Sequence, residues 1–384
     1  MSRFLAPGAT LGVMGGGQLA RMFVHAAQRM GYATAVLEPD AASPAGAVAH
    51  HHIRADYDDP QGWAALAELS DAVTTEFENV PAAALAQLAQ RRPVAPGAAA
   101  VAICQDRIAE KQHFVRCGVA CAPHAVLSAG VAPHDVDESL FPAILKTARL
   151  GYDGKGQVGV ADRRALEAAW DLLGRVDCVL EKELPLAHEV SVIVARNAGG
   201  DIVSLPVQQN LHRAGVLVLT QVPAPDVGAA LCGLALASAR RVAVSMDYVG
   251  VLCVEFFVLQ DGTLVANEMA PRPHNSGHYS IDACDLSQFE LQVRAMTGAP
   301  MPVPRLHSPA AMLNLMGDLW TRDSQQPPDW TRLLALPGAH LHLYGKSQAR
   351  SGRKMGHLTV TAPDAHGCGV VAQQAARALG IPVW

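Results

Sequence analysis

Two glutamates, Glu255 and Glu268, are the residues of this 384-residue chain whose types and spacing point most directly to chemistry. They stand in two apolar, strand-like runs, VLCVEFFVL and TLVANEMA, that meet at an Asp-Gly pair, the favoured two-residue turn of a β-hairpin. If Asp261 and Gly262 form that turn, the two glutamates face each other directly. Opposed carboxylates repel, and an unpaired buried carboxylate is costly. A divalent cation between them removes both costs, and these oxygen ligands suit Mg²⁺, or Mn²⁺, which prefers the same kind of ligand.

The alternative for this hairpin is that one glutamate faces solvent and pairs with a lysine. Asn267, the neighbour of Glu268, points to the opposite face if the strand is regular. A bend at that position would turn its side chain toward the cation. The pattern therefore predicts Glu255 and Glu268 as the metal ligands.

A second candidate is the glycine-rich segment LGYDGKGQ, residues 150–157. Its glycines allow backbone N–H groups to approach a polyanion closely, and Lys155 adds a mobile positive charge. The segment lacks the G-x-x-x-x-G-K-[ST] pattern of a P-loop, and the VGVAD that follows is strand-like. We therefore expect a β-hairpin that covers phosphates, with a bare hairpin turn as the alternative.

Charged residues also interrupt the neighbouring apolar runs. Lys146 lies inside AILKTA, a poor site for an ammonium group unless it meets an anion. Glu181 ends one apolar run, and Glu189 begins another. A carboxylate at a strand edge can accept a hydrogen bond from an adenine amino group, and a second one can accept from ribose hydroxyls. Each glutamate by itself would be ordinary surface charge.

The order of apolar runs predicts the elements that position these residues. From residue 10 to about 95, short apolar runs alternate with helical periodicity, which predicts a parallel sheet wound with helices. Strands then dominate, with helices expected at about 103–117 and 227–246. The fold class is therefore α/β, with an α+β central part and a small β-rich C-terminal part. Two proline-rich stretches divide the chain into three predicted domains: 1–102, 103–300 and 301–384.

The stretch MGGGQLA near the N-terminus meets most of a dinucleotide-binding fingerprint. Gly15, Gly17 and Ala20 have its spacing after a strand-like run, and Glu38 ends the next run. A nicotinamide-dependent dehydrogenase is therefore one alternative, but it leaves the paired glutamates and the second glycine loop unexplained, so we expect no NAD. A non-catalytic nucleotide-binding protein is another alternative, but it has no need for all of these features together.

Composition excludes several classes of partner. A net charge of −5 and a pI near 6.3 give no general attraction to nucleic acid or to an anionic membrane. No segment has the ~18 uninterrupted apolar residues of a membrane helix, and the N-terminus lacks a signal-peptide pattern. Eight cysteines without a C-x-x-C pair predict reduced, mostly buried thiols. We expect a cytoplasmic protein.

Six short motifs follow one another along the chain: GGGQLARM (15–22), EFENVP (76–81), GYDGKGQ (151–157), NLH (210–212), APRPHNSGH (270–278) and GRKMGH (352–357). Together they resemble the ATP-grasp superfamily and, within it, the carboxylating ligases of purine biosynthesis. The resemblance covers nearly the whole chain, and PHNSGH is its most specific part. It implies an ATP-grasp fold preceded by a Rossmann-like pre-ATP-grasp domain that binds no nicotinamide.

The resemblance also implies a reaction. ATP and bicarbonate would carboxylate 5-aminoimidazole ribonucleotide to N5-carboxyaminoimidazole ribonucleotide, through carboxyphosphate. The implied cofactor is Mg²⁺ without biotin, the partners are these small molecules, and the implied assembly is a homodimer. The nearest alternatives are other ATP-grasp ligases, namely a formate-dependent glycinamide ribonucleotide transformylase and a biotin carboxylase.

The site residues that the resemblance implies fall into three groups. The ATP-binding group is Arg107, Lys146, Gly151, Tyr152, Asp153, Gly154, Lys155, Gly156, Gln157, Glu181, Lys182, Glu183, Leu184, Glu189, His212, Asn267 and Glu268. The substrate-binding group is Gly17, Gln18, Leu19, Glu76, Tyr152, Asp153, Lys155, Arg272, His274, Asn275, Ser276, Lys346, Arg353 and Lys354. The catalytic group is Arg272, His274, Lys146 and Asp153. Lys346 and Arg353 would hold the ribonucleotide 5′-phosphate, for which the alternative is a solvated basic turn.

Overall fold

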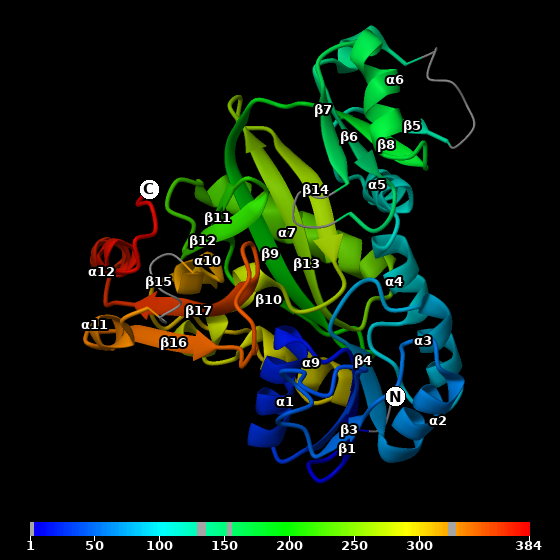
Figure 1. Cartoon of the computed structure of the whole chain (residues 1–384), viewed down its shortest axis with the longest axis vertical. Coiled ribbons are helices and arrows are strands. Elements are labelled where there is room, and N and C mark those ends of the chain that lie inside the picture. Colours follow the sequence, from blue (N-terminus) through cyan, green and yellow to red (C-terminus); the bar gives the residue numbers. More distant parts are fainter. Residues whose placement is uncertain (1–3, 129–135, 152–155, 322–327) are drawn as a thin grey trace.

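Three sheets organise the chain in a computed structural model, which describes residues 4–128, 136–151, 156–321 and 328–384. Figure 1 shows the N-terminal part (blue) at the bottom of the view and the large sheet (green to yellow) at its centre. A smaller sheet with helix α6 lies at the upper right, and the C-terminal elements (orange and red) lie at the left (Figure 1).

The parallel sheet predicted for the N-terminal region is confirmed. Its strands, in spatial order, are β3 (His51–Ile53), β2 (Ala33–Leu37), β1 (Thr10–Met14) and β4 (Ala72–Thr75). The helices of this region are α1 (Gln18–Arg29), α2 (Pro60–Leu69), α3 (Ala82–Ala89) and α4 (Ala98–Cys104). β1, β2 and β4 are almost wholly buried, as continuous apolar runs in a parallel sheet require.

The smaller sheet is antiparallel and carries the flanks of the predicted phosphate loop. Its strands, in spatial order, are β5 (His124–Leu127), β8 (Cys178–Lys182), β6 (Ala143–Thr147) and β7 (Gln157–Val160). The helical elements beside it are α6 (Arg163–Leu172) and the short η1 (Glu138–Leu140). Because β6 and β7 pair directly, the predicted hairpin is confirmed. Residues 152–155 within its loop lie outside the described residues.

The large sheet joins the central and C-terminal parts of the chain. In spatial order its described strands are β14 (Leu264–Ala270), β13 (Gly250–Leu259), β9 (Leu186–Arg196), β11 (Gln208–Arg213), β12 (Val216–Val222), β15 (Ala310–Met316), β17 (Lys354–Thr361) and β16 (Ala339–Leu343). The strand β10 (Ile202–Ser204) pairs with β9. Because β12 pairs with β15, one sheet runs across the domain boundary predicted at residues 300 and 301. This pairing does not decide where the domains begin and end, so the three domain ranges stay predictions.

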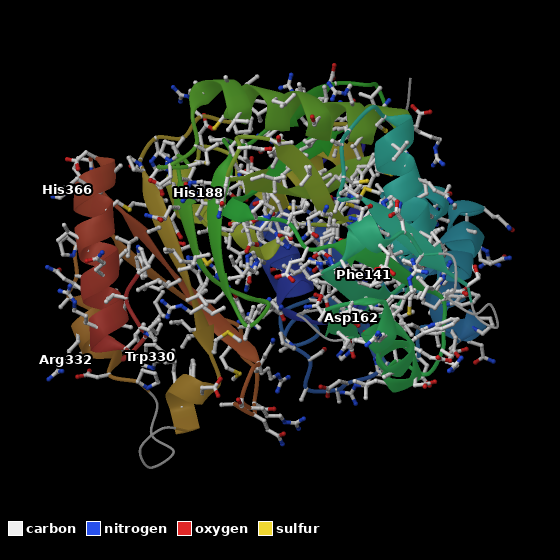
Figure 2. All side chains as sticks on the ribbon, turned by 90° about the horizontal axis from the view of Figure 1, so that it is seen from above. Phe141, Asp162, His188, Trp330, Arg332 and His366 are labelled. Atoms are coloured by element: carbon white, nitrogen blue, oxygen red, sulfur yellow. The ribbon has the colours of Figure 1, made fainter. Side chains whose placement is uncertain are left out.

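Helices cover both faces of this sheet. The predicted helix α7 (Ala229–Ser245) packs on the face that carries Leu252 and Val254, and α9 (Gln288–Thr297) packs on the face that carries Val251 and Cys253. The remaining helical elements are η2 (Asn275–Gly277), α8 (Ser280–Ala283), α10 (Asp318–Thr321), α11 (Trp330–Leu334) and α12 (Ala365–Ala378). Seen from above, α12 with His366 lies on the opposite side of the molecule from Phe141 and Asp162 (Figure 2).

The eight cysteines are all free thiols, as predicted, and four of them are buried. None of the helices in the described part of the chain combines the length and the apolar character needed to cross a membrane.

The helix expected at about 103–117 was predicted with the wrong start. The chain forms α4, which ends at Cys104, and a separate α5 (Arg107–Arg116). The side chain of Asp106 accepts hydrogen bonds from the backbone N–H groups of Ile108 (2.9 Å) and Ala109 (3.3 Å), so it caps a new helix. Apolar periodicity does not reveal a cap, and for this reason the break was missed.

The two-residue turn expected at Asp261 and Gly262 was also wrong. Leu259 N–H donates to the carbonyl of Thr263 (2.8 Å), so the loop has three residues, 260–262. Gly262 takes a positive φ of 82°, as the last residue of a three-residue loop requires. The pairing beside the turn is therefore shifted by one residue from the predicted register.

Asp106→Ala should lower the free energy of unfolding by about 1 kcal/mol, because two N–H groups at the start of α5 lose their acceptor. Chemical denaturation of the purified protein measures this difference. Asp106→Asn keeps an acceptor oxygen and serves as the control, which should lose less. Equal stability of Asp106→Ala and the unchanged protein would show that the cap does not stabilise α5.

Candidate functional site

A cavity of about 520 Å³ is lined by residues from the N-terminal region, the large sheet and the C-terminal strands. The predicted site residues in its lining are Gln18, Leu19, Glu76, Arg107, Gly151, Glu255, Glu268, Arg272, His274, Asn275, Lys346, Arg353 and Lys354. The fold therefore brings together site residues from all three predicted domains.

Other predicted residues are not in this lining. Tyr152, Asp153, Gly154 and Lys155 lie outside the described residues. Those that the structure describes but that do not line the cavity are Gly17, Lys146, Gly156, Gln157, Glu181, Lys182, Glu183, Leu184, Glu189, His212, Asn267 and Ser276. Several of these hold the lining residues in place.

Glu255 and Glu268 meet at a β-bulge. The pairing of β13 with β14 shifts between Val254 and Phe256, so Glu255 opposes both Asn267 and Glu268. The predicted opposition of the two glutamates is therefore confirmed, because the bulge restores the register that the longer turn had shifted. The bulge also supplies the bend that would turn Asn267 toward a cation.

The surroundings of these carboxylates fit a hard cation. Burial, followed by the negative charge of Glu268, raises the pKa of Glu255 to about 7. The Oδ1 atom of Asn267 is buried and has no hydrogen-bond partner among the described residues. A divalent ion beside these oxygens would favour ionised Glu255 and give Oδ1 a partner. Arg107 Nη1 lies 3.0 Å from Glu268 Oε2 and supplies positive charge at the same place.

A buried triad of charges lies behind the bulge, and sequence reasoning missed one of its members, Lys111. Its Nζ lies 3.2 Å from Glu181 Oε1 and donates to the backbone carbonyl of Asn267 at 3.0 Å. Lys146 Nζ lies 2.9 Å from Glu181 Oε2, so the anion expected beside Lys146 is Glu181. Burial would raise the pKa of Glu181, but the two ammonium groups outweigh it and lower this pKa to about 2.

Glu189 and His212 form a second pair on neighbouring strands, with 2.6 Å between Oε2 and Nδ1. Burial lowers the pKa of His212, but the hydrogen bond to Glu189 and the charges of Glu255, Glu189 and Glu268 outweigh it and raise this pKa overall. The imidazole is therefore held in one orientation, and its protonated form is favoured more than in a free histidine.

Arg272 is paired with Glu78, a second residue that sequence reasoning missed. Nε of Arg272 donates to Glu78 Oε2, and Nη1 donates to the carbonyl of Pro273 at 3.2 Å. Glu78 stands in the quoted motif EFENVP, so the motif marked the segment without marking this carboxylate. The ion pair orients the Arg272 guanidinium in the wall of the cavity.

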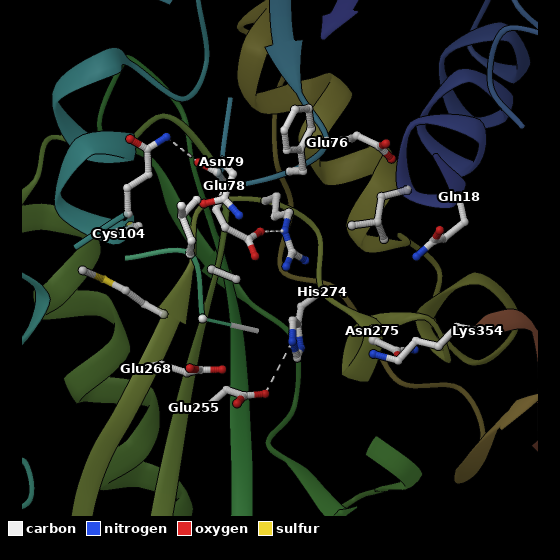
Figure 3. Close-up of a pocket in the computed structure, with 18 of the residues that line it drawn as sticks. Gln18, Glu76, Glu78, Asn79, Cys104, Glu255, Glu268, His274, Asn275 and Lys354 are labelled. Atoms are coloured by element: carbon white, nitrogen blue, oxygen red, sulfur yellow. Dashed lines mark hydrogen bonds and ion pairs between the residues drawn. The ribbon is translucent and has the colours of Figure 1, made fainter. Parts of the chain in front are cut away.

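His274 lies between the paired glutamates and Lys354 in the lining of the cavity (Figure 3). Its Nε2 is 3.5 Å from Glu255 Oε1, and its Nδ1 is 2.9 Å from Ser276 Oγ. Burial, together with the charges of Arg272 and Lys354, holds the pKa of His274 well below its usual range. The ring is therefore neutral near pH 7 and can accept a proton only at some cost.

The glycine turn at the N-terminus already holds two carboxylates. Gly16 N–H donates to Glu38 Oε2 at 2.8 Å, and the N–H groups of Gly17 and Ala20 donate to the two oxygens of Glu76. A Cβ on Gly17 would lie 2.5 Å from the Glu76 carboxylate, so a larger residue there would displace that carboxylate. The helix N-terminus that binds a pyrophosphate in dinucleotide-binding proteins is neutralised here by the chain's own side chains.

Three cationic side chains, Lys346, Arg353 and Lys354, also line the cavity. Lys346 Nζ donates to the carbonyl of Lys354 at 2.7 Å, and Arg353 Nη1 donates to the carbonyl of Gln348 at 2.8 Å. Burial, and then the charges of Arg353 and Lys354, lower the pKa of Lys346 to about 8. Figure 3 shows Lys354 beside Asn275, away from Glu255 and Glu268.

Lys111→Met should lower the free energy of unfolding by about 3 kcal/mol, the lower end of the cost of breaking a buried ion pair. Glu181→Gln should be destabilising as well, and the double variant should lose less than the sum of the two. Chemical denaturation of all four proteins gives this coupling. Strict additivity would mean that the two groups do not interact across their 3.2 Å separation.

Known family models match three successive parts of the chain. A ribonucleotide synthetase preATP-grasp domain matches residues 8–105, an ATP-grasp domain matches 112–289, and a phosphoribosylaminoimidazole carboxylase C-terminal domain matches 310–369.

Similar proteins match almost the entire chain. An N5-carboxyaminoimidazole ribonucleotide synthase of Brucella melitensis is 44% identical over 94% of this chain and 98% of its own length. A crystal structure of an N5-carboxyaminoimidazole ribonucleotide synthetase in complex with ADP has a TM-score of 0.91 at 38% identity, with 99% and 98% of the two chains covered. The Aspergillus clavatus synthase in complex with ADP and 5-aminoimidazole ribonucleotide has a TM-score of 0.89 at 31% identity, covering 97% and 99%. From the order of its domains and its similarity to these proteins, the chain belongs to the N5-carboxyaminoimidazole ribonucleotide synthase family of ATP-grasp ligases.

Proposed function

We propose that this protein carboxylates 5-aminoimidazole ribonucleotide with bicarbonate and ATP, in purine biosynthesis, to give N5-carboxyaminoimidazole ribonucleotide, ADP and phosphate. The observation that carries the proposal is the order of groups along one cavity. The carboxylates of Glu255 and Glu268, which fit a divalent cation, lie on one side of His274, and Lys354 lies on the other (Figure 3). Lys346, which bonds to the carbonyl of Lys354, lines the same cavity and suits a ribonucleotide phosphate, as do Arg353 and Arg272.

In the first step, a bicarbonate oxygen attacks the γ-phosphorus of ATP, and the bond to the β,γ-bridging oxygen breaks to release ADP. Arg107, which lines the cavity, and Lys146, which Glu181 holds behind it, would offset the negative charge of the phosphates. Glu255 and Glu268 would hold Mg²⁺, with Asn267 beside them. When bound, the ion supplies charge neutralisation to the transferring phosphoryl group.

In the second step, the exocyclic amine of the ribonucleotide attacks the carbon of carboxyphosphate, or CO₂ released from it, and phosphate leaves. Arg272 is suited to hold the planar bicarbonate or carboxyphosphate oxygens in a bidentate manner. The amine must lose a proton, for which His274 and Asp153 are the candidates. His274 is neutral and lies between the paired glutamates and Lys354, while Asp153 lies outside the described residues.

Carboxyphosphate hydrolyses readily, so the second step requires exclusion of water. The loop between β6 and β7 is our candidate for a cover over the cavity, because Gly151 at its start is part of the lining. Its role as a cover, the homodimer, the cytoplasmic location and independence from biotin stay predictions.

The decisive experiment measures ADP release by the purified protein with Mg-ATP and bicarbonate, with and without 5-aminoimidazole ribonucleotide. Release that depends on the ribonucleotide, with acid-labile fixation of labelled bicarbonate, is the expected result. Glycinamide ribonucleotide with formate, and biotin with bicarbonate, are the comparison substrates. Preference for either set would move the protein to another ATP-grasp reaction.

Glu268→Ala and Lys146→Ala should each reduce ATP turnover by about 100-fold or more, because each removes a group that offsets charge in phosphoryl transfer. Both variants should remain folded, since Glu181 keeps Lys111 as a partner and Glu268 is partly exposed. Steady-state ADP release and thermal unfolding measure the two properties. Glu167→Ala, at an exposed position on α6, is the control. Retained turnover in either site variant would exclude the assigned role.

The pKa of Lys346, near 8, predicts a pH effect on ribonucleotide binding. Below pH 8 the ammonium is charged and can hold a phosphate, whereas above it kcat/KM for the ribonucleotide should fall by about tenfold per pH unit. Lys346→Arg keeps its charge and should flatten this decline. Profiles of kcat/KM for the ribonucleotide and for ATP separate this effect from others. A decline that persists in Lys346→Arg would exclude Lys346 as its cause.

A further inference from the structure

Three potential metal ligands lie together at the site and have no joint role in the proposed reaction. Cys253, Glu255 and His274 each offer one ligand atom, and these atoms all lie within 4.8 Å of one another. Cys253 precedes Glu255 by two residues on β13, so the two side chains share one face of the strand. Within the described residues, this sulfur, oxygen and nitrogen set differs in kind from the oxygen ligands expected for Mg²⁺.

The spacing of this cluster can be compared with the spacing of ligands around a tetrahedral zinc ion. With zinc bonded at about 2.0 to 2.3 Å, ligand atoms stand roughly 3.3 to 3.6 Å apart. Nε2 of His274 is already 3.5 Å from Glu255 Oε1, and the three ligand atoms lie within 4.8 Å of one another. The wider separations would have to close by up to about 1.5 Å on binding. Nδ1 of His274 lies 2.9 Å from Ser276 Oγ and accepts from the backbone N–H of Ser276 at 3.3 Å. Binding of an ion at Nε2 would move the ring proton to Nδ1, which would then donate to Ser276 Oγ, as the second nitrogen of a ligating histidine does.

Charge balance also favours a divalent ion here. Burial and the charge of Glu255 hold the pKa of the Cys253 thiol well above its usual value, so the ion itself would have to displace the thiol proton. The thiolate and the Glu255 carboxylate together would then offset both positive charges of the ion. Such a neutral set suits a buried position, and Cys253 is fully buried. The nearby cation Arg272 is already paired with Glu78 and so opposes the ion less. Glu255 and His274 line the cavity, which gives the ion a route of entry.

We propose that Cys253, Glu255 and His274 form a Zn²⁺ site, and that Zn²⁺ bound there inhibits the enzyme by taking Glu255 from the catalytic cation and His274 from the substrate. The binding of Zn²⁺ follows from the three side chains alone, whereas its inhibitory effect rests on the proposed function. The thiolate ligand is what distinguishes the two sites, because soft sulfur ligands select zinc and oxygen ligands select magnesium.

The test uses Co²⁺ as a spectroscopic substitute for Zn²⁺, added to the full chain without nucleotide under a reducing phosphine. We expect one equivalent of Co²⁺ to bind with a near-ultraviolet thiolate-to-cobalt absorption band, and one equivalent of Zn²⁺ to abolish the band. In Cys253→Ala the band should disappear and Zn²⁺ affinity should fall by more than about 100-fold, since even partners that only orient ligands are worth roughly 10- to 100-fold. Cys284→Ala, a buried cysteine of the same hydrophobic cluster, is the matched control and should keep the band.

Inhibition is measured separately, as the Zn²⁺ concentration that halves ADP release at a fixed Mg²⁺ concentration. Cys253→Ala should require at least about tenfold more Zn²⁺ than the unchanged protein, and added Mg²⁺ should relieve the inhibition. Should Cys253→Ala unfold at a lower temperature, Cys253→Ser serves in its place. The zinc site would be overturned if Cys253→Ala or Cys253→Ser kept the cobalt band, or if the unchanged protein showed no band. A band without any effect of Zn²⁺ on ADP release would overturn the inhibition.

Because the cobalt titration contains no substrate, its outcome does not depend on the reaction that the protein catalyses. A failed ribonucleotide assay with a normal cobalt band would overturn the proposed function and leave the zinc site in place. A normal ribonucleotide assay without the cobalt band would overturn the zinc site and leave the proposed function in place.

Discussion

The buried ammonium group of Lys111 is the interaction on which most of the candidate site depends. It donates to the carbonyl of Asn267 at the bulge in β14 and lies 3.2 Å from Glu181 on β8. Through Glu181 it also fixes the place of Lys146. One charge thereby joins the large sheet, which carries the paired glutamates, to the smaller sheet, which carries the flanks of the predicted phosphate loop. Each member of this triad is buried, and removal of any one of them would leave another charge without full compensation.

The N-terminal region has the backbone form of a dinucleotide-binding motif, but its own carboxylates occupy the position of the usual ligand. The glycine turn and the start of α1 still point N–H groups at an anion, but Glu38 and Glu76 occupy that position. Tyr57 also donates to Glu38. A dinucleotide pyrophosphate would have to displace these carboxylates, so the fingerprint here stabilises the fold and brings Glu76 to the edge of the cavity.

Helices and strands were predicted correctly where the signal lay within one short segment of the sequence. The parallel N-terminal sheet, the β6–β7 hairpin, α7 and the β13–β14 hairpin all follow from apolar periodicity and turn residues. Two errors also have local causes. The cap at Asp106 splits an expected helix, and the extra residue in the turn at 260–262 shifts the register. The opposition of Glu255 and Glu268 was predicted correctly, although the bulge that produces it has no marker in the sequence.

The sequence by itself determined which residue types were present to do chemistry and which short segments carried them: two acidic residues in apolar strands, a lysine in a third, a glycine loop and a basic turn. Only the tertiary structure decided their partners. Glu181 lies between Lys111 and Lys146, Glu78 holds Arg272, and Cys253 comes within reach of His274. These pairings join residues that are far apart in the chain or on different elements. They are selected by the cost of burying a charge without a partner, which is a property of the assembled interior and not of any one segment.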